Sequence, residues 1–446
     1  MSTTWTGLQR LVKASRRVEA NGVNPETICH TAKESIADSF VASPHALEAG
    51  ELSIAKRIED AANLNCQPAS NWLARREKRS AGALFANVIA MHDPFGRAAG
   101  EPLVVAVTTP FPPNDSLHKL LVEHVPDVEV HFTRYNESRD ARAARGANSG
   151  VLPAGIEVPT VDDATRAVWE RAHVFVGIDL PSESETLSPD LKWMQTISAG
   201  VDQIDQQQLV RMGARLSSAS GVASASIAEF VMARLLGVWK NLRSIEQHQR
   251  EETWVEDFGT EVTGRTMVIA GLGSIGRQVA RRARAFDMHV IATRGSAKAG
   301  DSDPDVDELH PAADLASLLP MADAVVCALP TSTATIDLFD AAMFRTMKSD
   351  AIFCNVGRGT LVVEDDLVEV LNEGHLRAAV LDVMRTEPLV EGDRLWSVPR
   401  LHLSPHAAVS LDRYQQNAWA ITSDNLRRFM AGGRLNNEIN LPSLTT

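Results

Sequence analysis

The sequence predicts an α/β protein with two doubly wound parallel sheets and an N-terminal helical extension. Three observations support this fold class. An apolar run at 267–270 leads directly into a Gly-x-Gly-x-x-Gly turn and an amphipathic helix. Strand-like apolar runs alternate with helical segments after residue 264, and a shorter alternation of the same kind occupies about 99–219. The 446 residues also exceed one ordinary hydrophobic core, so more than one domain is expected.

The predicted helical extension covers residues 1–98. It contains the order Asn24-Pro25-Glu26, in which a cap, a proline at the first helical position and an acid in the first turn are typical of a helix start. Two further helical segments are expected at 53–64 and 72–91. No catalytic constellation stands out, so we interpret the extension as a segment that packs on the body or on another subunit.

The next domain, 99–219, is predicted to be built on a small parallel sheet. Its expected strands are 103–107, 128–132, 173–178 and 192–197, and its expected helices are 116–123 and 162–172. The segment 137–157 is rich in Arg, Ala and Gly, and we interpret it as a surface loop.

The third domain, 220–410, starts with a long linking helix at 226–241 and continues as a nucleotide-binding alternation. Six strands are expected, at 267–270, 289–293, 324–329, 351–356, 378–383 and 401–403. A final helix at about 412–430 follows the sixth strand. We expect the C-terminal segment 411–446 to return to the first sheet and complete that domain.

Composition and charge exclude several classes of function. Hydrophobic residues make up 44% of the chain and charged residues 23%, as in soluble globular proteins. The formal net charge of −13 argues against nucleic acid or an acidic membrane surface as the main partner. No run of about eighteen apolar residues exists, so no membrane span is expected. The N-terminus shows no apolar signal-peptide core, and a reducing cytoplasm is the expected location.

The four cysteines predict neither a metal site nor a redox pair. Cys29, Cys66, Cys327 and Cys354 lack the spacing of zinc ligands or of a CxxC pair. Cys327 and Cys354 lie in apolar strand-like runs, so we expect both to be buried, inert thiols.

The glycine turn predicts a dinucleotide site. Gly271 permits the tight turn, Gly273 lets a pyrophosphate approach the backbone, and Gly276 lets the helix pack on the strand. The backbone at Ser274 and Ile275 begins the helix, where unpaired N–H groups and the positive end of the helix dipole favour phosphate.

Arg294 stands about 20 residues after this turn, where NAD-binding proteins carry an acid for the ribose 2′-hydroxyl. A guanidinium instead favours a 2′-phosphate through its charge and its fork geometry. NADP(H) is therefore the preferred cofactor, with NAD(H) as the alternative. The other interpretation of Arg294 is a surface arginine without a ligand.

Polar residues follow three neighbouring predicted strands. Arg358 lies between two glycines after 351–356, Asp382 and Glu387 leave 378–383, and His406 leaves 401–403. Because ligands bind at the carboxyl ends of such strands, we expect these four side chains to lie together. Arg358 suits a carboxylate, and His406 with Glu387 forms an acid–base pair in outline. Taken singly, Arg358 could equally be a turn residue that points to water, and a lone histidine is more often structural.

The chain from about 99 to 446 resembles the D-isomer-specific 2-hydroxyacid dehydrogenases. The motifs that carry the resemblance are Ser198-Ala199-Gly200-Val201-Asp202, the glycine turn, Leu329-Pro330-Thr331, Asn355-Val356-Gly357-Arg358-Gly359, Leu381-Asp382-Val383 with Glu387-Pro388, and Ser404-Pro405-His406. The phrase at 363–367 is similar to the glyoxylate and hydroxypyruvate reductase branch. The chain departs from the family at Arg294, in its first hundred residues, and at Met384. There the family usually has an aromatic residue, and we interpret the change as packing.

The resemblance implies a flavodoxin-like substrate domain at 99–219 and a Rossmann coenzyme domain at 220–410. It makes Arg358 the substrate-binding arginine and Glu387 with His406 the acid–base pair. It makes Asp382 the partner of the nicotinamide carboxamide and the backbone of Ala199, Gly200 and Val201 a seat for the substrate carboxylate. Pro330 and Val356 would line the cofactor site.

We therefore expect an NAD(P)-dependent oxidoreductase that transfers hydride reversibly to C2 of a small 2-oxo acid such as glyoxylate or hydroxypyruvate. The resemblance further implies a D product and a homodimer. One alternative is a non-enzymatic nicotinamide-binding sensor, similar to corepressor-like relatives, which the extension 1–98 keeps open. A different reaction such as formate oxidation is disfavoured, because that branch has an amide where this chain has Glu387.

Overall fold

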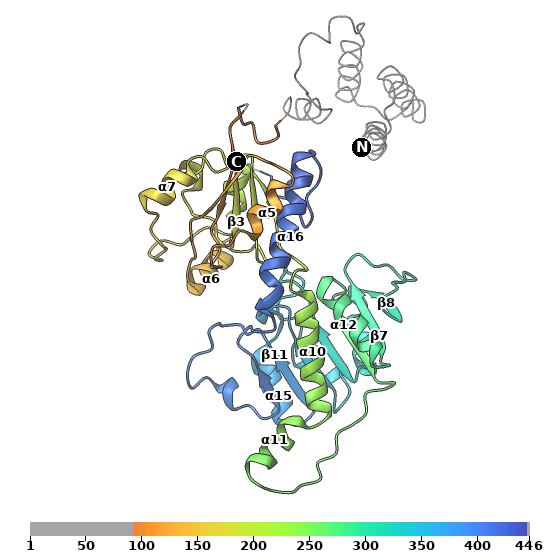
Figure 1. Ribbon diagram of the computed structural model, residues 1–446. Coiled ribbons are helices and arrows are strands. Elements are labelled where there is room, and N and C mark those ends of the chain that lie inside the picture. The colour runs from red at the N-terminus through yellow and green to blue at the C-terminus, as the bar shows by residue number, and fades with distance from the viewer. Residues whose placement is uncertain (1–92, 99, 444–446) are drawn as a thin grey trace, which may run out of the picture. The chain divides into compact units, whose positions relative to one another are not determined.

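The computed structural model describes residues 93–98 and 100–443, and Pro94–Thr446 form one compact unit that contains both sheets. The expected helices of the extension, together with Cys29 and Cys66, lie outside the described residues. Figure 1 shows the two sheets with their helices. The expected fold class of two parallel-sheet α/β domains is confirmed.

The first sheet is parallel throughout and has the strand order β2-β1-β3-β4-β5. Its strands are β1 (Leu103–Val107), β2 (Val128–Phe132), β3 (Val174–Gly177), β4 (Trp193–Thr196) and β5 (Arg215–Ser217). This order is the flavodoxin-like one. The first four strands confirm the prediction. The three-residue β5 was missed, because so short a run shows no periodicity.

Alternate residues of β1 face two different helical layers. Leu103, Val105 and Val107 pack with α5 (Ser116–Val122) and α16 (Leu411–Met430), whereas Val104 and Ala106 pack against the opposite layer. That layer contains α7 (Asp163–Trp169), α8 (Ser184–Leu187) and α9 (Gln206–Met212). Burial on both faces explains why the strand reads as a continuous apolar run. The C-terminal helix therefore returns to the first sheet, as expected.

The second sheet has seven parallel strands in the order β12-β11-β10-β9-β6-β7-β8. They are β6 (Thr266–Ala270), β7 (His289–Arg294), β8 (Glu308–Pro311), β9 (Ala324–Cys327), β10 (Ile352–Asn355), β11 (Ala378–Leu381) and β12 (Leu401–Leu403). This is the Rossmann order with one added strand. The six expected strands are confirmed. The edge strand β8 was missed, because only Leu309 of its four residues is buried.

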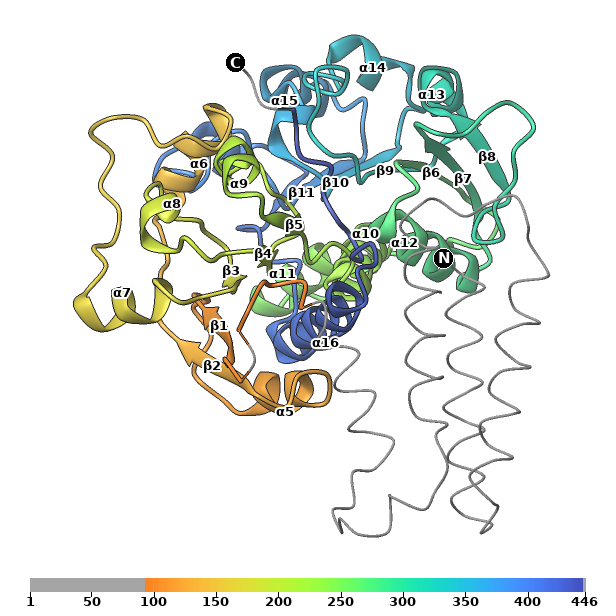
Figure 2. The ribbon, with the colours of Figure 1, turned by 90° about the horizontal axis from the view of Figure 1, so that it is seen from above.

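Helices cover both faces of the second sheet, as Figure 2 shows from above. On one face, α10 (Ser224–Trp239) and α12 (Ser274–Ala285) pack on Met267 and Ile269. On the other, α13 (Leu315–Leu318), α14 (Ala341–Thr346) and α15 (Glu364–Asn372) pack on Val268 and Ala270. The linking helix is thus α10, and α11 (Leu242–Arg250) follows it. No helix in the described part of the chain is long and apolar enough to cross a membrane.

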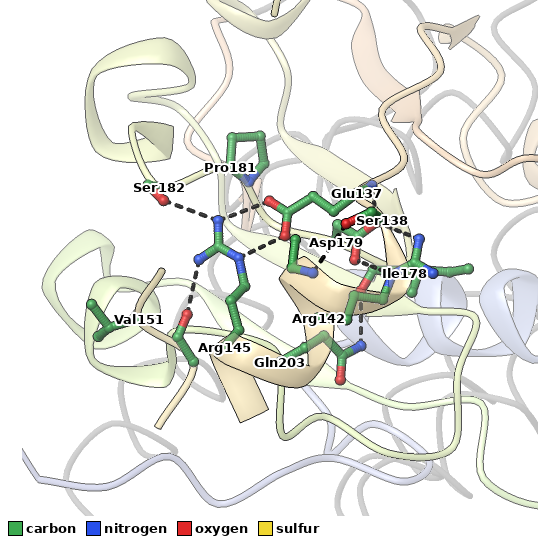
Figure 3. A network of polar contacts seen from close by, with 12 residues as sticks. Glu137, Ser138, Arg142, Arg145, Val151, Ile178, Asp179, Pro181, Ser182 and Gln203 are labelled. Carbon is green, nitrogen blue, oxygen red and sulfur yellow. Dashed lines mark hydrogen bonds and ion pairs between the residues drawn. The ribbon is translucent and has the colours of Figure 1, made fainter. Parts of the chain in front are cut away.

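The interpretation of 137–157 as a surface loop is wrong for its first half. Residues Arg139–Ala147 form helix α6, and the Ser138 side chain caps it by accepting a hydrogen bond from Ala141 N at 3.0 Å. The Arg145 side chain is only 1% exposed and makes a bidentate pair with buried Glu137, at 2.7 and 2.8 Å (Figure 3). The arginine content had predicted exposure to solvent, but the charges of Arg145 and Glu137 neutralise one another inside the domain.

Candidate active site

The glycine turn has the geometry that the sequence predicts. Gly271 follows β6 with a φ of +103°, and a Cβ there would lie 2.9 Å from the Ala328 carbonyl oxygen. A Cβ on Gly276 would lie 2.2 Å from the Gly271 carbonyl oxygen, so the helix can approach the strand only without a side chain. At Gly273 a Cβ would meet nothing within 4 Å. The turn therefore has no room for a side chain at Gly271 or Gly276, but it is open at Gly273.

The N-terminus of α12 opens onto the same space. Gly273 is its N-cap and provides no side-chain hydrogen bond, and Ser274 at the first position is exposed. The first N–H groups of the helix therefore have no side-chain cap and are available to an anion. An open turn beside an uncapped helix start fits the pyrophosphate of a dinucleotide. Nearby, Pro330 follows β9 and Val356 follows β10, where its N–H donates to the Cys327 carbonyl oxygen at 3.1 Å.

Arg294 ends β7 as expected, but it has a partner that sequence reasoning missed. One Arg294 nitrogen donates to the Asp303 carboxylate at 3.2 Å, while the Arg294 Nε is buried without a hydrogen bond. Arg277 holds the same carboxylate at 2.7 and 2.8 Å, and this hydrogen bonding keeps the pKa of Asp303 below its ordinary value. The end of β7 thus presents a cation and an acid together.

Glu387 and His406 form a direct pair. His406 Nδ1 lies 2.9 Å from one Glu387 carboxylate oxygen, and the other oxygen accepts a hydrogen bond from Met384 N at 2.9 Å. Burial alone raises the pKa of Glu387, but the bonds from His406 and Met384 outweigh it and leave the pKa below its ordinary value. The His406 side chain is 48% exposed, so its other ring nitrogen is accessible.

Asp382 organises the segment that carries His406. Its side chain is buried and accepts hydrogen bonds from Ser404 Oγ at 2.6 Å, Ala407 N at 2.9 Å and Ala408 N at 3.3 Å. Its carbonyl oxygen also accepts from His406 N at 2.9 Å. The predicted carboxamide partner is therefore also a support for the histidine, whose φ is +54°. Such backbone strain in a non-glycine residue persists only where its surroundings hold it.

Arg358 lies at the carboxyl end of β10, on a loop that Asn355 holds. Asn355 Nδ2 donates to the Arg358 carbonyl oxygen at 2.9 Å, and Asn355 Oδ1 accepts from Gly357 N at 3.0 Å. Sequence reasoning gave Asn355 no role, although its place before the glycines was a signal. A Cβ on Gly200 would lie 2.7 Å from a terminal nitrogen of Arg358. The loop containing Ala199, Gly200 and Val201 therefore reaches the guanidinium.

Two expectations about packing are also met. Met384 is buried in the core beneath the β10 and β11 loops, as its interpretation required. Cys327 and Cys354 are buried and unbonded, and burial raises the pKa of the Cys327 thiol to about 12 and that of Cys354 further. Both thiols stay protonated and unreactive.

Comparisons with known proteins identify the family of this chain. The family model for the NAD-binding domain of D-isomer specific 2-hydroxyacid dehydrogenases matches residues 232–408 of this sequence. A glyoxylate/hydroxypyruvate reductase B from Citrobacter koseri is 32% identical over 286 residues, which cover 60% of this chain and 86% of that protein. The corresponding protein of Salmonella typhi is 30% identical, and the matched region covers 70% of this chain and 91% of that protein.

Solved structures give the same result. A D-isomer specific 2-hydroxyacid dehydrogenase family protein from Aeromonas salmonicida is 26% identical, with a TM-score of 0.60 over 77% of this chain and 100% of that one. An NADPH-dependent glyoxylate/hydroxypyruvate reductase from Sinorhizobium meliloti, in complex with NADP and sulfate, is 25% identical, with a TM-score of 0.58 over 75% and 98%. The chain belongs to the D-isomer specific 2-hydroxyacid dehydrogenases, which are NAD(P)-dependent oxidoreductases acting on CH–OH groups.

Proposed function

We propose that this protein reduces a small 2-oxo acid, such as glyoxylate or hydroxypyruvate, to the D-2-hydroxy acid with NADPH, and that the reaction is reversible. The observation that carries the proposal is the His406–Glu387 hydrogen bond of 2.9 Å at the same sheet edge as Arg358. The names of the reductases from Citrobacter and Salmonella support the choice of substrates.

The bound nicotinamide would supply the hydride in reduction and accept it in oxidation. Arg358 binds the substrate carboxylate and lies beside the Ala199–Val201 backbone, which seats the same group. Because His406 Nδ1 faces Glu387, the Nε2 atom is the one that gives a proton to the substrate oxygen as negative charge develops there. Glu387 fixes the tautomer and stabilises the imidazolium. In the oxidative direction, Nε2 starts unprotonated and takes the proton.

The cofactor preference follows from the end of β7. We propose NADP(H) over NAD(H), because the Arg294 guanidinium lies where the 2′-phosphate would bind. Its ion pair with Asp303 has to loosen when the phosphate arrives, so the phosphate competes with a carboxylate for the same guanidinium. The preference for NADP(H) over NAD(H) is therefore moderate rather than absolute. At the other end of the cofactor, Asp382, Pro330 and Val356 would contact the nicotinamide.

We also propose a homodimer in a reducing cytoplasm. Apolar side chains are exposed on α11 and the segment after it, among them Trp254 at 96% and Phe258 at 80%. A soluble chain rarely leaves such a surface uncovered, and a second copy supplies a matching one. The buried free thiols Cys327 and Cys354 fit a reducing compartment. Light scattering on wild type and on Trp254→Ser tests the dimer.

A direct assay tests the activity. The folded protein is mixed with NADPH or NADH and with glyoxylate, hydroxypyruvate or phenylpyruvate, and loss of the reduced-nicotinamide absorbance is followed. We expect turnover that is faster with NADPH and a product of D configuration by chiral chromatography. Absence of turnover with every 2-oxo acid would rule out the proposal and favour the sensor alternative.

A further inference from the structure

Helix α6 carries three arginines, and only one of them lacks a carboxylate partner in the described part of the chain. Arg145 is paired with Glu137, and Arg142 is paired with Asp179 at 2.7 and 2.8 Å (Figure 3). Arg139, at the first helical position, is exposed and makes no ion pair with any described residue. Its charge is therefore available to a ligand.

The position of Arg139 is well determined by what holds its helix. The Ser138 side chain caps the helix, and the Arg145–Glu137 and Arg142–Asp179 pairs tie α6 to the segments that follow β2 and β3. Arg145 additionally donates to the Gly150 carbonyl oxygen at 2.9 Å. These contacts fix the backbone from which the Arg139 side chain extends.

The face of α6 that carries Arg139 is turned toward the substrate-binding loop. Arg139 and Gly146 are seven residues apart and lie on the same helical face. A Cβ on Gly146 would lie 3.8 Å from the Cβ of Asp202, and the preceding Gly200 contacts the Arg358 guanidinium. Independently, the charge of Arg139 contributes to the lowered pKa of Glu387, after the larger effects of burial, His406 and Met384. The shared helical face turns Arg139 toward the loop that contains Gly200 and Asp202, and the effect of its charge on Glu387 agrees with that orientation.

We propose that Arg139 is a specificity-determining residue that binds an anionic group at the far end of the substrate, so that 2-oxo acids with a second carboxylate or a phosphate ester are favoured over those with an uncharged side chain. This inference rests on the proposed function, in which Arg358 takes the carboxylate next to the keto group. A second cation that forms no ion pair within the described part of the chain then has no role in binding a monoanion as small as glyoxylate. It suits a longer, doubly charged acid.

Kinetic selectivity tests the proposal. Values of kcat/KM are measured for 2-oxoglutarate, oxaloacetate and 3-phosphohydroxypyruvate, and for 2-oxopentanoate and 2-oxobutyrate, monoanions of similar length that have no second anionic group. In Arg139→Gln we expect kcat/KM for an acid with a second anionic group to fall at least about tenfold, mainly through KM, with less than about threefold change for the monoanions. Arg139→Lys should restore part of the loss. The substrate whose kcat/KM falls most shows whether Arg139 binds a carboxylate or a phosphate.

The matched control is Arg166→Gln, which removes from α7 of the same domain one exposed arginine that forms no ion pair with residues 93–98 or 100–443. It should leave every ratio unchanged, because overall charge is not the cause. Calorimetric binding of 2-oxoglutarate and 2-oxopentanoate gives a second readout that needs no turnover. The inference is overturned if wild type binds the two acids equally, or if Arg139→Gln weakens both alike. If the proposed function itself is wrong, the wild-type protein will instead turn over no 2-oxo acid.

Discussion

Two glutamates, each paired with a basic side chain at the edge of a parallel sheet, have opposite surroundings. Glu137 and Arg145 in the first sheet domain are almost fully buried, and each also bonds to further groups such as Tyr135 and the Gly150 carbonyl oxygen. Glu387 and His406 in the second are partly exposed, and the histidine has one hydrogen-bonded ring nitrogen. The first pair has no capacity left for a ligand, whereas the second does.

The difference shows how similar residues serve different purposes. A buried, saturated pair fixes the position of α6 and with it Arg139, but its atoms cannot change partners without a large cost in free energy. A partly exposed pair contributes less to stability and can exchange a proton with a substrate. Breaking the Glu387–His406 pair should therefore lower activity, whereas breaking the Glu137–Arg145 pair should lower stability.

The largest expected effect is on turnover in His406→Ala. We expect kcat to fall by about two to four orders of magnitude, the usual scale for loss of a general acid–base group. The control is His310→Ala, because His310 also pairs with a glutamate, Glu308, at 3.0 Å, but on the edge strand β8. Wild-type kcat in His406→Ala would remove this residue from the mechanism.

Breaking the buried pair should mainly lower stability. Glu137→Gln leaves the Arg145 charge uncompensated, so we expect the free energy of unfolding in guanidinium chloride to drop by about 3 to 5 kcal/mol. Glu185→Gln, which breaks the exposed Glu185–Arg211 pair, should cost less than about 1 kcal/mol. Equal losses in the two variants would contradict the assigned difference in burial.

Arg358→Lys should weaken substrate binding without unfolding the protein. An ammonium group keeps the charge but cannot form the two parallel hydrogen bonds of a guanidinium, so kcat/KM should decrease by about ten- to hundredfold. Steady-state kinetics with glyoxylate measure it, and a melting temperature within about two degrees of wild type is the control for folding. Unchanged KM and kcat would show that the carboxylate binds elsewhere.

Arg294→Asp should shift cofactor preference toward NADH. The new acid would repel the 2′-phosphate together with Asp303 and can accept a hydrogen bond from the ribose hydroxyl. We expect the NADPH/NADH ratio of kcat/KM to fall by about tenfold or more. Arg284→Asp, on α12 away from the strand end, is the control. An unchanged ratio in Arg294→Asp would mean that this arginine does not contact the 2′ position.

The smallest expected effect concerns acid stability. Because the folded-state pKa of Glu387 is depressed, its contribution to stability is present above the unfolded value of about 4.5 and is lost as pH falls through the folded value. The difference in unfolding free energy between wild type and Glu387→Gln should therefore shrink from about pH 6 to about pH 3. A difference that grows on acidification would contradict the lowered pKa.

Local signals account for what could be predicted about the fold. Apolar runs such as 103–107 and 324–327 are buried on both faces, so their strands are recognisable without any neighbour. The strands that were missed, β5 and β8, lie at sheet edges and are short or polar, and only pairing with a neighbour makes them strands. Helix α6 was missed for a related reason, because Arg145 is compatible with burial only when Glu137 lies against it.

The sequence by itself determined the glycine turn, the strand ends and the presence of Arg358, Glu387 and His406 at one sheet edge. These features depend on backbone geometry within a few residues and on the rule that parallel strands end together. Only the tertiary structure decided that Asp303 pairs with Arg294, that Asp382 holds the His406 segment, and that Arg139 on α6 has no ion-pair partner among the described residues. The physical reason is that a charge acquires its function from its neighbours in space, and chain folding brings those neighbours from distant positions.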